Sequence, residues 1–176
     1  MTRPQISVFI AQSLDGYIAR PDHSIDWLET FDTSGEDHGY QPFYDSCDAL
    51  VIGRATLEVA LQFTKWPWEG KRVIVATHRP IGRRHGEETH EGPFAPLFER
   101  LAREGVKRVY LDGGETIRLA LAEGLVDDMT ITTLPILLGA GRPLFGGPVV
   151  PERWKVVMHR AFPSGLVQGT WIRDDT

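Results

Sequence analysis

The stretch LDGGETIRLALAEGLVDD, residues 111–128, decides the fold because a strand, a glycine pair and a helix follow one another in it without a linker. The strand ends at Gly113 and Gly114, and Thr116 stands where a helix over 116–123 is predicted to begin. Glycines let backbone N–H groups come close to a ligand, and a helix N-terminus attracts phosphate. The pair therefore indicates either a close backbone approach or a plain tight turn.

Outward from this stretch, apolar runs rich in Val and Ile alternate with segments of helical period, which is typical of an α/β domain. Strands are predicted at residues 6–13, 49–53, 72–77, 108–113, 128–137, 154–162 and 166–173. Helices are predicted at residues 41–46, 56–63, 96–104 and 116–123. No repeat, low-complexity tract or linker divides the sequence, so residues 1–176 are expected to form one domain.

The order of these elements predicts a mixed sheet. Helices long enough for crossovers separate the first four strands, so these strands are expected to be parallel neighbours. The last two strands face each other across the turn sequence PSG and are expected to form an antiparallel hairpin at the C-terminal edge. In such a sheet, ligands bind beyond the carboxyl ends of the parallel strands, so functional residues are sought there.

The composition indicates a folded, cytoplasmic protein. Hydrophobic residues make up 41% of the 176 residues and aromatic residues 10%, which argues against disorder. The net charge of -5 gives no general attraction to nucleic acid or to an anionic membrane. The single cysteine, Cys47, excludes an internal disulfide, and the N-terminal apolar run is too short for a signal peptide or a membrane span. The histidines lack metal-ligand spacing, so no metal site is expected.

Two strand ends in the first third of the chain carry candidate binding residues. Asp15 and Gly16 follow the first predicted strand, where they form either an ordinary turn or part of a binding site. The second strand ends at Gly53, and Thr56 can cap a helix whose free N–H groups suit a phosphate. Arg54 adds a guanidinium suited to bidentate phosphate contacts. The alternative is a simple turn with a solvated arginine.

A group of basic residues follows the next predicted strand, in a chain that is acidic overall. The group consists of His78, Arg79, Arg83, Arg84 and His85. Basic or hydroxyl side chains at such a strand end favour a cofactor that carries a ribose 2'-phosphate, and the alternative is a charged surface loop. The usual dinucleotide fingerprint G-x-G-x-x-G is absent from the sequence, so a nucleotide cofactor is expected to be held by another fold.

The segments IAQSLDGYIA, VIGRATLE, VIVATHRP and VYLDGGETIRLALAEGLVDDMTITTLPILLGAGRPLF together resemble the dihydrofolate reductase-like superfamily. Within it, the chain is similar to stand-alone proteins that resemble the C-terminal reductase domain of the bifunctional riboflavin-biosynthesis deaminase-reductase. The resemblance covers roughly residues 6–172. It implies a three-layer α/β fold with helices flanking the mixed sheet, an NADPH-dependent reductase and a homodimer. It also implies a cis peptide bond between Gly113 and Gly114, beside the cofactor.

The resemblance further implies a set of residues that bind NADPH. Ala11, on the first strand, is expected to contact the nicotinamide carboxamide. Contacts with the phosphates are expected from Gly53, Arg54 and Thr56. Residues near the adenosine 2'-phosphate are expected to be Thr77, His78 and Arg79. The residues expected to line the pyrophosphate are Gly113, Gly114, Glu115 and Thr116.

On the substrate side, the folate enzymes use a buried carboxylate that follows a tryptophan by several residues, and in this sequence that order is reversed. Here the sequence HSIDWLETFD offers Asp26, directly before Trp27, with Glu29 and Asp32 as further candidates. Asp15, in the sequence SLDG, is a candidate either for contact with substrate or for ordering the loop. The alternative for Asp26 is a helix N-cap beside a core Trp27. We assign the catalytic role to Asp26 and Asp15, and substrate binding to Ser13, Asp15, Asp26 and Trp27.

Two functions of different classes are consistent with the sequence. The first is an NADPH-dependent reductase that acts on a pterin, on a pyrimidine like 5-amino-6-(5-phosphoribosylamino)uracil, or on another small heterocycle. In such an enzyme the protein supplies orientation, a dry pocket and a route for the proton, and needs no covalent nucleophile. The second is a nucleotide-binding or interaction protein without turnover on the same scaffold, which the displaced carboxylate would allow.

Overall fold

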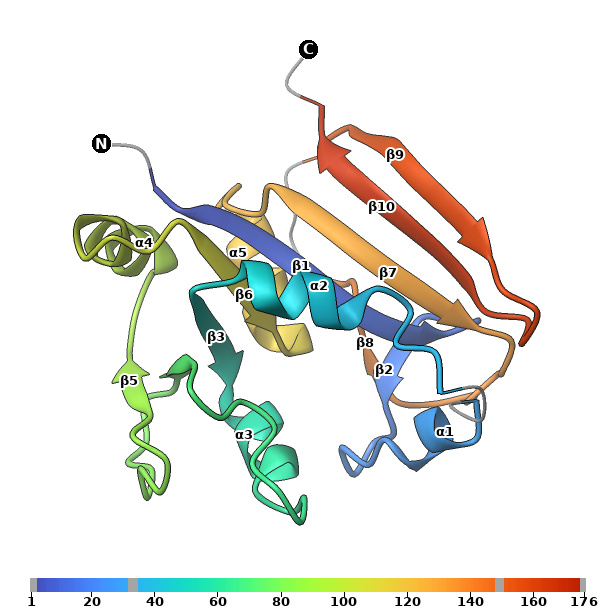
Figure 1. The fold of residues 1–176 in the computed structure, drawn as a ribbon, viewed down its shortest axis with the longest axis horizontal. Coiled ribbons are helices and arrows are strands. Elements are labelled where there is room, and N and C mark those ends of the chain that lie inside the picture. Colours follow the sequence, from blue (N-terminus) through green and yellow to red (C-terminus); the bar gives the residue numbers. More distant parts are fainter. Residues whose placement is uncertain (1–2, 32–34, 148–150, 175–176) are drawn as a thin grey trace.

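The computed structural model describes residues 3–31, 35–147 and 151–174 of the chain. A sheet of eight strands runs across this part of the molecule (Figure 1). In spatial order its strands are β5 (Glu88–His90), β4 (Arg72–Ala76), β3 (Ala49–Gly53), β6 (Arg108–Asp112), β1 (Gln5–Ser13), β7 (Asp128–Leu134), β10 (Val167–Arg173) and β9 (Trp154–Ala161). A separate small sheet pairs β2 (Tyr17–Ala19) with β8 (Arg142–Pro143).

The predicted mixed sheet is confirmed. The strands from β5 to β7 run parallel, and β10 and β9 add an antiparallel hairpin at the edge. The four strands predicted to be parallel neighbours do lie side by side, in the order β4, β3, β6 and β1, with Val109 of β6 opposite Ile6 on one side and Ala49 on the other. The order of parallel strands depends on how each crossover packs back onto the sheet, which the spacing of elements along the sequence does not specify.

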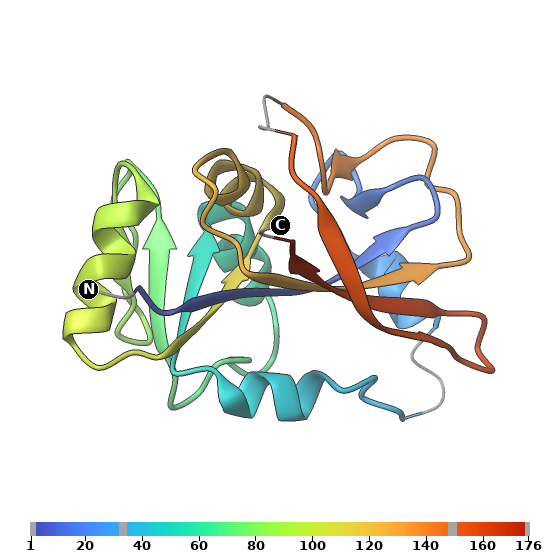
Figure 2. The same ribbon diagram turned by 90° about the horizontal axis from the view of Figure 1, so that it is seen from above.

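Helices on both faces of the sheet make the three layers of the fold. The helices in the described residues are α1 (Asp26–Glu29), α2 (Tyr40–Ser46), α3 (Arg54–Ala60), α4 (Phe94–Arg103) and α5 (Gly114–Ala122). Figure 2 shows α4 and α5 on one side of the sheet and α2 on the other. In the described ranges, every helix falls short of the length and apolar content needed to cross a membrane.

The buried strand β3 shows why both faces need a covering layer. Its Ala49 and Val51 belong to the core that includes side chains of α4 and α5. Its Leu50 and Ile52 belong to the opposite core, against which α2 and α3 pack. Successive side chains of a strand point to opposite faces of the sheet, so a strand that is apolar at every position requires packing on both sides.

Several element boundaries differ from the prediction for local reasons. The elements β2, β5, β8 and α1 were not predicted, since they have only two to four residues and show no period. The strand predicted at 128–137 ends at Leu134, where the N–H of Ile136 turns back to the Leu134 carbonyl. Helix α5 begins before Thr116, because the chain turns at the N-cap residue Gly113.

Candidate active site

A cleft of about 810 Å³ lies at the carboxyl ends of β3, β4 and β6, which is where ligands bind in parallel sheets. The first residues of α3 and α5 and the small β2–β8 sheet complete its walls. The cleft is lined by every residue predicted to contact the cofactor: Ala11, Gly53, Arg54, Thr56, Thr77, His78, Arg79, Gly113, Gly114, Glu115 and Thr116. The fold thus gathers four separate segments of the chain on one surface, while the contact of each residue with a cofactor stays a prediction.

The glycine pair makes the turn from β6 into α5. Gly113 has a φ of 97°, and a Cβ added there would lie 2.7 Å from Oγ1 of Thr56. A Cβ added to Gly114 would lie 2.8 Å from Cδ1 of Ile18. The turn at the glycine pair is therefore packed closely against two neighbouring segments, while a close approach to a ligand stays a prediction. The expected cis peptide bond is wrong: the described residues contain none, and the positive φ of Gly113 turns the chain.

The N-terminus of α5 opens onto the cleft. Its N-cap is Gly113, and no side chain in the described residues caps it. The Thr116 hydroxyl donates at 2.7 Å to the carbonyl of Asp112, so this side chain holds the strand-to-helix turn together. The uncapped N–H groups of the first turn and the positive end of the helix dipole favour a bound anion.

Basic side chains gather around the same cleft. Arg54 is held by Glu58 at 2.8 Å, on the outer face of α3. Arg118 donates at 2.6 Å to the carbonyl of Pro143, which ties α5 to the β2–β8 sheet. Other basic residues that line the cleft are His78, Arg79 and Arg142. Guanidinium groups held by fixed partners suit the phosphates of a dinucleotide.

Asp112, a carboxylate that the sequence reasoning missed, lies in the wall of the cleft at the end of β6. Its Oδ1 accepts the N–H of Gly113 at 2.8 Å. Burial raises the pKa of Asp112 to about 6, and the hydrogen bond from Gly113 opposes this shift. A signal was present in the sequence, namely a charged residue that ends an apolar strand just before the glycine pair. A carboxyl with this pKa exchanges a proton near neutral pH and suits acid-base chemistry.

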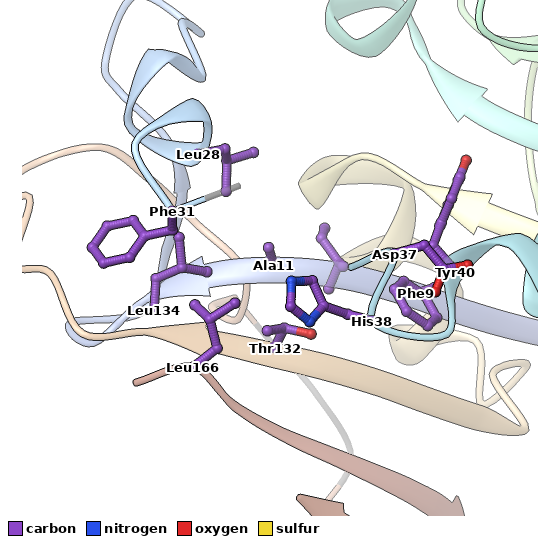
Figure 3. Close-up of a pocket in the computed structure, with 11 residues that line it drawn as sticks. Phe9, Ala11, Leu28, Phe31, Asp37, His38, Tyr40, Thr132, Leu134 and Leu166 are labelled. Carbon is purple, nitrogen blue, oxygen red and sulfur yellow. The ribbon is translucent and has the colours of Figure 1, made fainter. Parts of the chain in front are cut away.

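A second cavity, of about 260 Å³, adjoins the cleft. Both spaces are lined by Phe9, Ile10, Ala11 and Leu28, so β1 forms a wall of each. Figure 3 shows the cavity between β1, β7, α1 and the segment that leads into α2. Its remaining lining residues are Phe31, Asp37, His38, Tyr40, Thr132, Leu134 and Leu166. A molecule in this cavity would therefore lie next to one in the cleft.

Two tyrosines, the buried Tyr110 and the partly buried Tyr40, stand near the boundary between the two spaces. Tyr110 lines the cleft and donates its hydroxyl to the carbonyl of Phe9 at 3.0 Å. Tyr40 lines the cavity, and burial raises its pKa to about 12. Burial also raises the pKa of Tyr110, so both hydroxyls stay protonated at neutral pH, and the Tyr110 hydroxyl fixes the wall that β1 contributes.

The predicted catalytic residue Asp26 lies outside both spaces. Its side chain is 63% exposed and pairs with Arg20 at 2.7 Å, and this partner lowers its pKa. Trp27 is 2% exposed and packs behind the cavity with Leu134 and Leu166, rather than lining it. The alternative of a core tryptophan is confirmed, whereas the N-cap of α1 is Ile25 and not Asp26. Of the other candidates, Glu29 is exposed at the end of α1, and Asp32 lies outside the described residues.

Asp15 orders a loop, the second of its two predicted roles. Its carboxylate accepts the Ser13 hydroxyl at 2.6 Å and the N–H groups of Leu138 and Gly139 at 3.1 and 2.8 Å. These hydrogen bonds lower its pKa. Neither Asp15 nor Ser13 is among the residues that line the cleft or the cavity. Asp15 and Asp26, the two predicted catalytic carboxylates, are thus absent from the lining of both the cleft and the cavity. Asp37 lines the cavity and Asp112 lines the cleft.

The fold of the described residues is similar to that of dihydrofolate reductase. The dihydrofolate reductase of Enterococcus faecalis, solved in complex with NADP(H), superposes with a TM-score of 0.64 at 17% identity, covering 97% of each chain. At this identity the likeness concerns the fold alone.

Residues 70–168 match the family model described as the RibD C-terminal domain, and the chain belongs to this family of reductase domains. A protein from Shewanella sp. PV-4, whose description proposes a role in riboflavin biosynthesis, is 36% identical with a TM-score of 0.88, covering 97% of this chain and 99% of that one. The Bacillus subtilis protein YwjB, which is uncharacterized, is 37% identical over 141 residues, which is 78% of this chain and 80% of YwjB.

Proposed function

We propose that the chain is an NADPH-dependent reductase that transfers hydride to a small heterocycle bound in the cavity beside the cleft. The observation that carries this proposal is the shared wall at Phe9, Ile10 and Ala11. A dinucleotide along the cleft and a small acceptor in the cavity would meet there. Hydride transfer requires this contact, because the donor and acceptor carbons must approach each other closely.

The residues of the cleft fit the cofactor. The turn at Gly113 and Gly114 is a backbone cradle that a Cβ would fill, and the N-terminus of α5 next to it attracts a pyrophosphate. The basic residues around the cleft can bind the remaining phosphates. The NADP(H) complex of the Enterococcus enzyme, which shares the fold, and the family of reductase domains support the same cofactor. When bound, NADPH supplies the hydride from its nicotinamide ring.

The protein's own side chains orient the reactants and handle the proton. Arg54 and Arg79 hold phosphate groups, while the backbone of β1 around Ala11 positions the nicotinamide. The aliphatic and aromatic walls of the cavity exclude water from the acceptor. Asp112 lines the cleft and not the cavity, and its raised pKa of about 6 makes it a group of the cleft that can exchange a proton near neutral pH.

A titration with NADPH and NADH tests this function. Energy transfer from the protein's tryptophans to the bound nicotinamide would report binding, and NADPH is expected to bind more tightly than NADH. Loss of NADPH absorbance with dihydrofolate and with 5-amino-6-(5-phosphoribosylamino)uracil would then report turnover. If millimolar NADPH changes neither the fluorescence nor the melting temperature, the proposal is wrong. Tight binding without turnover would favour the non-catalytic nucleotide-binding alternative.

The proposed enzyme is a homodimer, as the family resemblance implies. Sedimentation velocity at micromolar concentration would show one species at twice the mass of the chain, and a monomer would contradict this part of the proposal.

A further inference from the structure

The cavity beside the cleft carries a polar edge on mainly apolar walls. Aliphatic and aromatic residues make up most of its lining. Besides Tyr40, whose hydroxyl also interacts with Trp68 and Tyr110, the polar lining side chains are His38, Thr132 and Asp37. If the proposed reductase function holds, this edge selects the molecule that receives the hydride.

His38 presents an unused hydrogen-bonding atom. Its Nδ1 is buried and has no hydrogen-bond partner among the described residues. The ring is held edge-on to Phe162, with 4.6 Å between the ring centroids, and Figure 3 shows it extending toward Ala11 and Thr132. The backbone of His38 has a φ of 51°, a region that few residues other than glycine adopt. A buried, unpaired nitrogen in a strained segment costs free energy, and a ligand that bonds to it recovers part of that cost.

Gln168 fixes His38 and Thr132 relative to each other. Its buried side-chain amide donates at 3.0 Å to the carbonyl of His38 and at 2.9 Å to Oγ1 of Thr132. Because the Thr132 oxygen accepts this bond, its own hydroxyl proton remains available to donate. The cavity therefore presents one hydroxyl donor and one imidazole nitrogen, held by a single amide from β10.

Charge distinguishes the cavity from the cleft. The Asp37 carboxylate, at the exposed mouth of the cavity, accepts the N–H groups of Gly39 and Gln41, each at 3.0 Å, and these bonds lower its pKa. It is therefore ionised at neutral pH. A phosphate dianion in this cavity would meet a like charge and would lose its hydration against apolar walls, which is costly. Arg160, which lies over the ring of Phe162, is already paired with Glu36 at 3.2 Å.

We propose that the hydride acceptor of this protein is a planar heterocycle without a phosphate group, and that the edge of its ring hydrogen-bonds to Nδ1 of His38 and to the hydroxyl of Thr132. The cavity volume of about 260 Å³ agrees with this, since it is below the range of roughly 300–1,000 Å³ found for most small-molecule sites and suits a compact ligand. The phosphates in the complex then belong to the cofactor, in the basic cleft.

A matched pair of ligands tests this inference. Calorimetry on the full chain saturated with NADP⁺ would compare 5-amino-6-(5-phosphoribosylamino)uracil with the same compound after enzymatic removal of its phosphate, and 7,8-dihydrobiopterin would serve as a second phosphate-free probe. We expect at least one phosphate-free probe to bind about tenfold more tightly than the phosphorylated compound. Equal or tighter binding of the phosphorylated compound would overturn the inference, as would failure of all three to bind at millimolar concentration.

Two variants test the hydrogen bonds proposed for His38 and Thr132. His38→Asn, chosen because Asn tolerates a positive φ, and Thr132→Val are each expected to weaken the phosphate-free probe about tenfold while leaving NADP⁺ affinity unchanged. His159→Asn, on the exposed strand β9, is the matched control and should change neither affinity. Unchanged probe binding in both folded variants would overturn the inference. Failure of the unmodified chain to bind NADP⁺ would instead contradict the proposed function.

Discussion

Replacement of Asp112 by Asn should make the protein more stable at high pH. The carboxyl of Asp112 has its pKa raised from 3.8 to about 6 by burial. A group whose folded pKa is raised binds protons more tightly in the folded state. It therefore stabilises the protein below its unfolded pKa, and this stability is lost as the pH rises through the folded pKa. Asn removes the titration but keeps a side-chain oxygen that can accept the N–H of Gly113.

The size of the pKa shift of Asp112 determines how much the unfolding free energy changes with pH. Two pKa units correspond to about 3 kcal/mol of unfolding free energy, an upper figure because the side chain borders a cleft that water can enter. Because the pKa differs between the folded and the unfolded state, about 2 kcal/mol of this unfolding free energy is lost between roughly pH 4.5 and pH 8. Over that interval the unmodified protein should lose about 2 kcal/mol relative to Asp112→Asn. The change comes from the titration of Asp112 alone, so it should appear without any ligand.

Urea unfolding at both pH values, followed by tryptophan fluorescence, measures this difference. Asp45→Asn, at an exposed position on α2, is the control and should follow the unmodified protein. If Asp112→Asn and the unmodified protein lose stability in parallel, the carboxyl does not titrate as its burial requires, and the reasoning fails. If Asp112 supplies a proton during turnover, the unmodified enzyme is expected to slow as the pH rises above about 6, and Asp112→Asn should lack this decline.

Three further outcomes are expected. Gly113→Ala, at a φ of 97° with a Cβ 2.7 Å from Thr56, should lower the unfolding free energy by about 1–3 kcal/mol in urea and weaken NADPH binding; an unchanged protein would contradict the close packing of this turn. Arg79→Ala should weaken NADPH about tenfold in a fluorescence titration with NADH unaffected; equal losses for both nucleotides would place Arg79 away from the 2'-phosphate. Asp15→Ala should speed hydrogen exchange at Leu138 and Gly139, because both N–H groups lose their acceptor, and protection equal to the unmodified protein would refute the anchoring role.

The sequence by itself determined the longer strands and helices and the strand ends at which the predicted cofactor-binding residues stand. Strand and helix periods, and the glycines that end the strands, are local properties, so the sheet with its C-terminal hairpin and the turn at Gly113 could be predicted. All the residues predicted for the cofactor come from strand ends or from the first turns that follow them. The carboxyl ends of parallel strands share one edge of the sheet, and the order β4, β3, β6 and β1 brings these residues into one cleft.

Only the tertiary structure decided the substrate side. Asp26 lies next to a tryptophan, although it precedes Trp27 where the folate pattern has it follow. The four-residue helix α1 turns Trp27 into the core and leaves Asp26 paired with Arg20 at the surface. His38 reaches the cavity through a loop held by Gln168, 130 residues further along the chain. The physical reason is that a loop takes its direction from contacts with distant segments, and these contacts leave no period or spacing in the sequence around the loop.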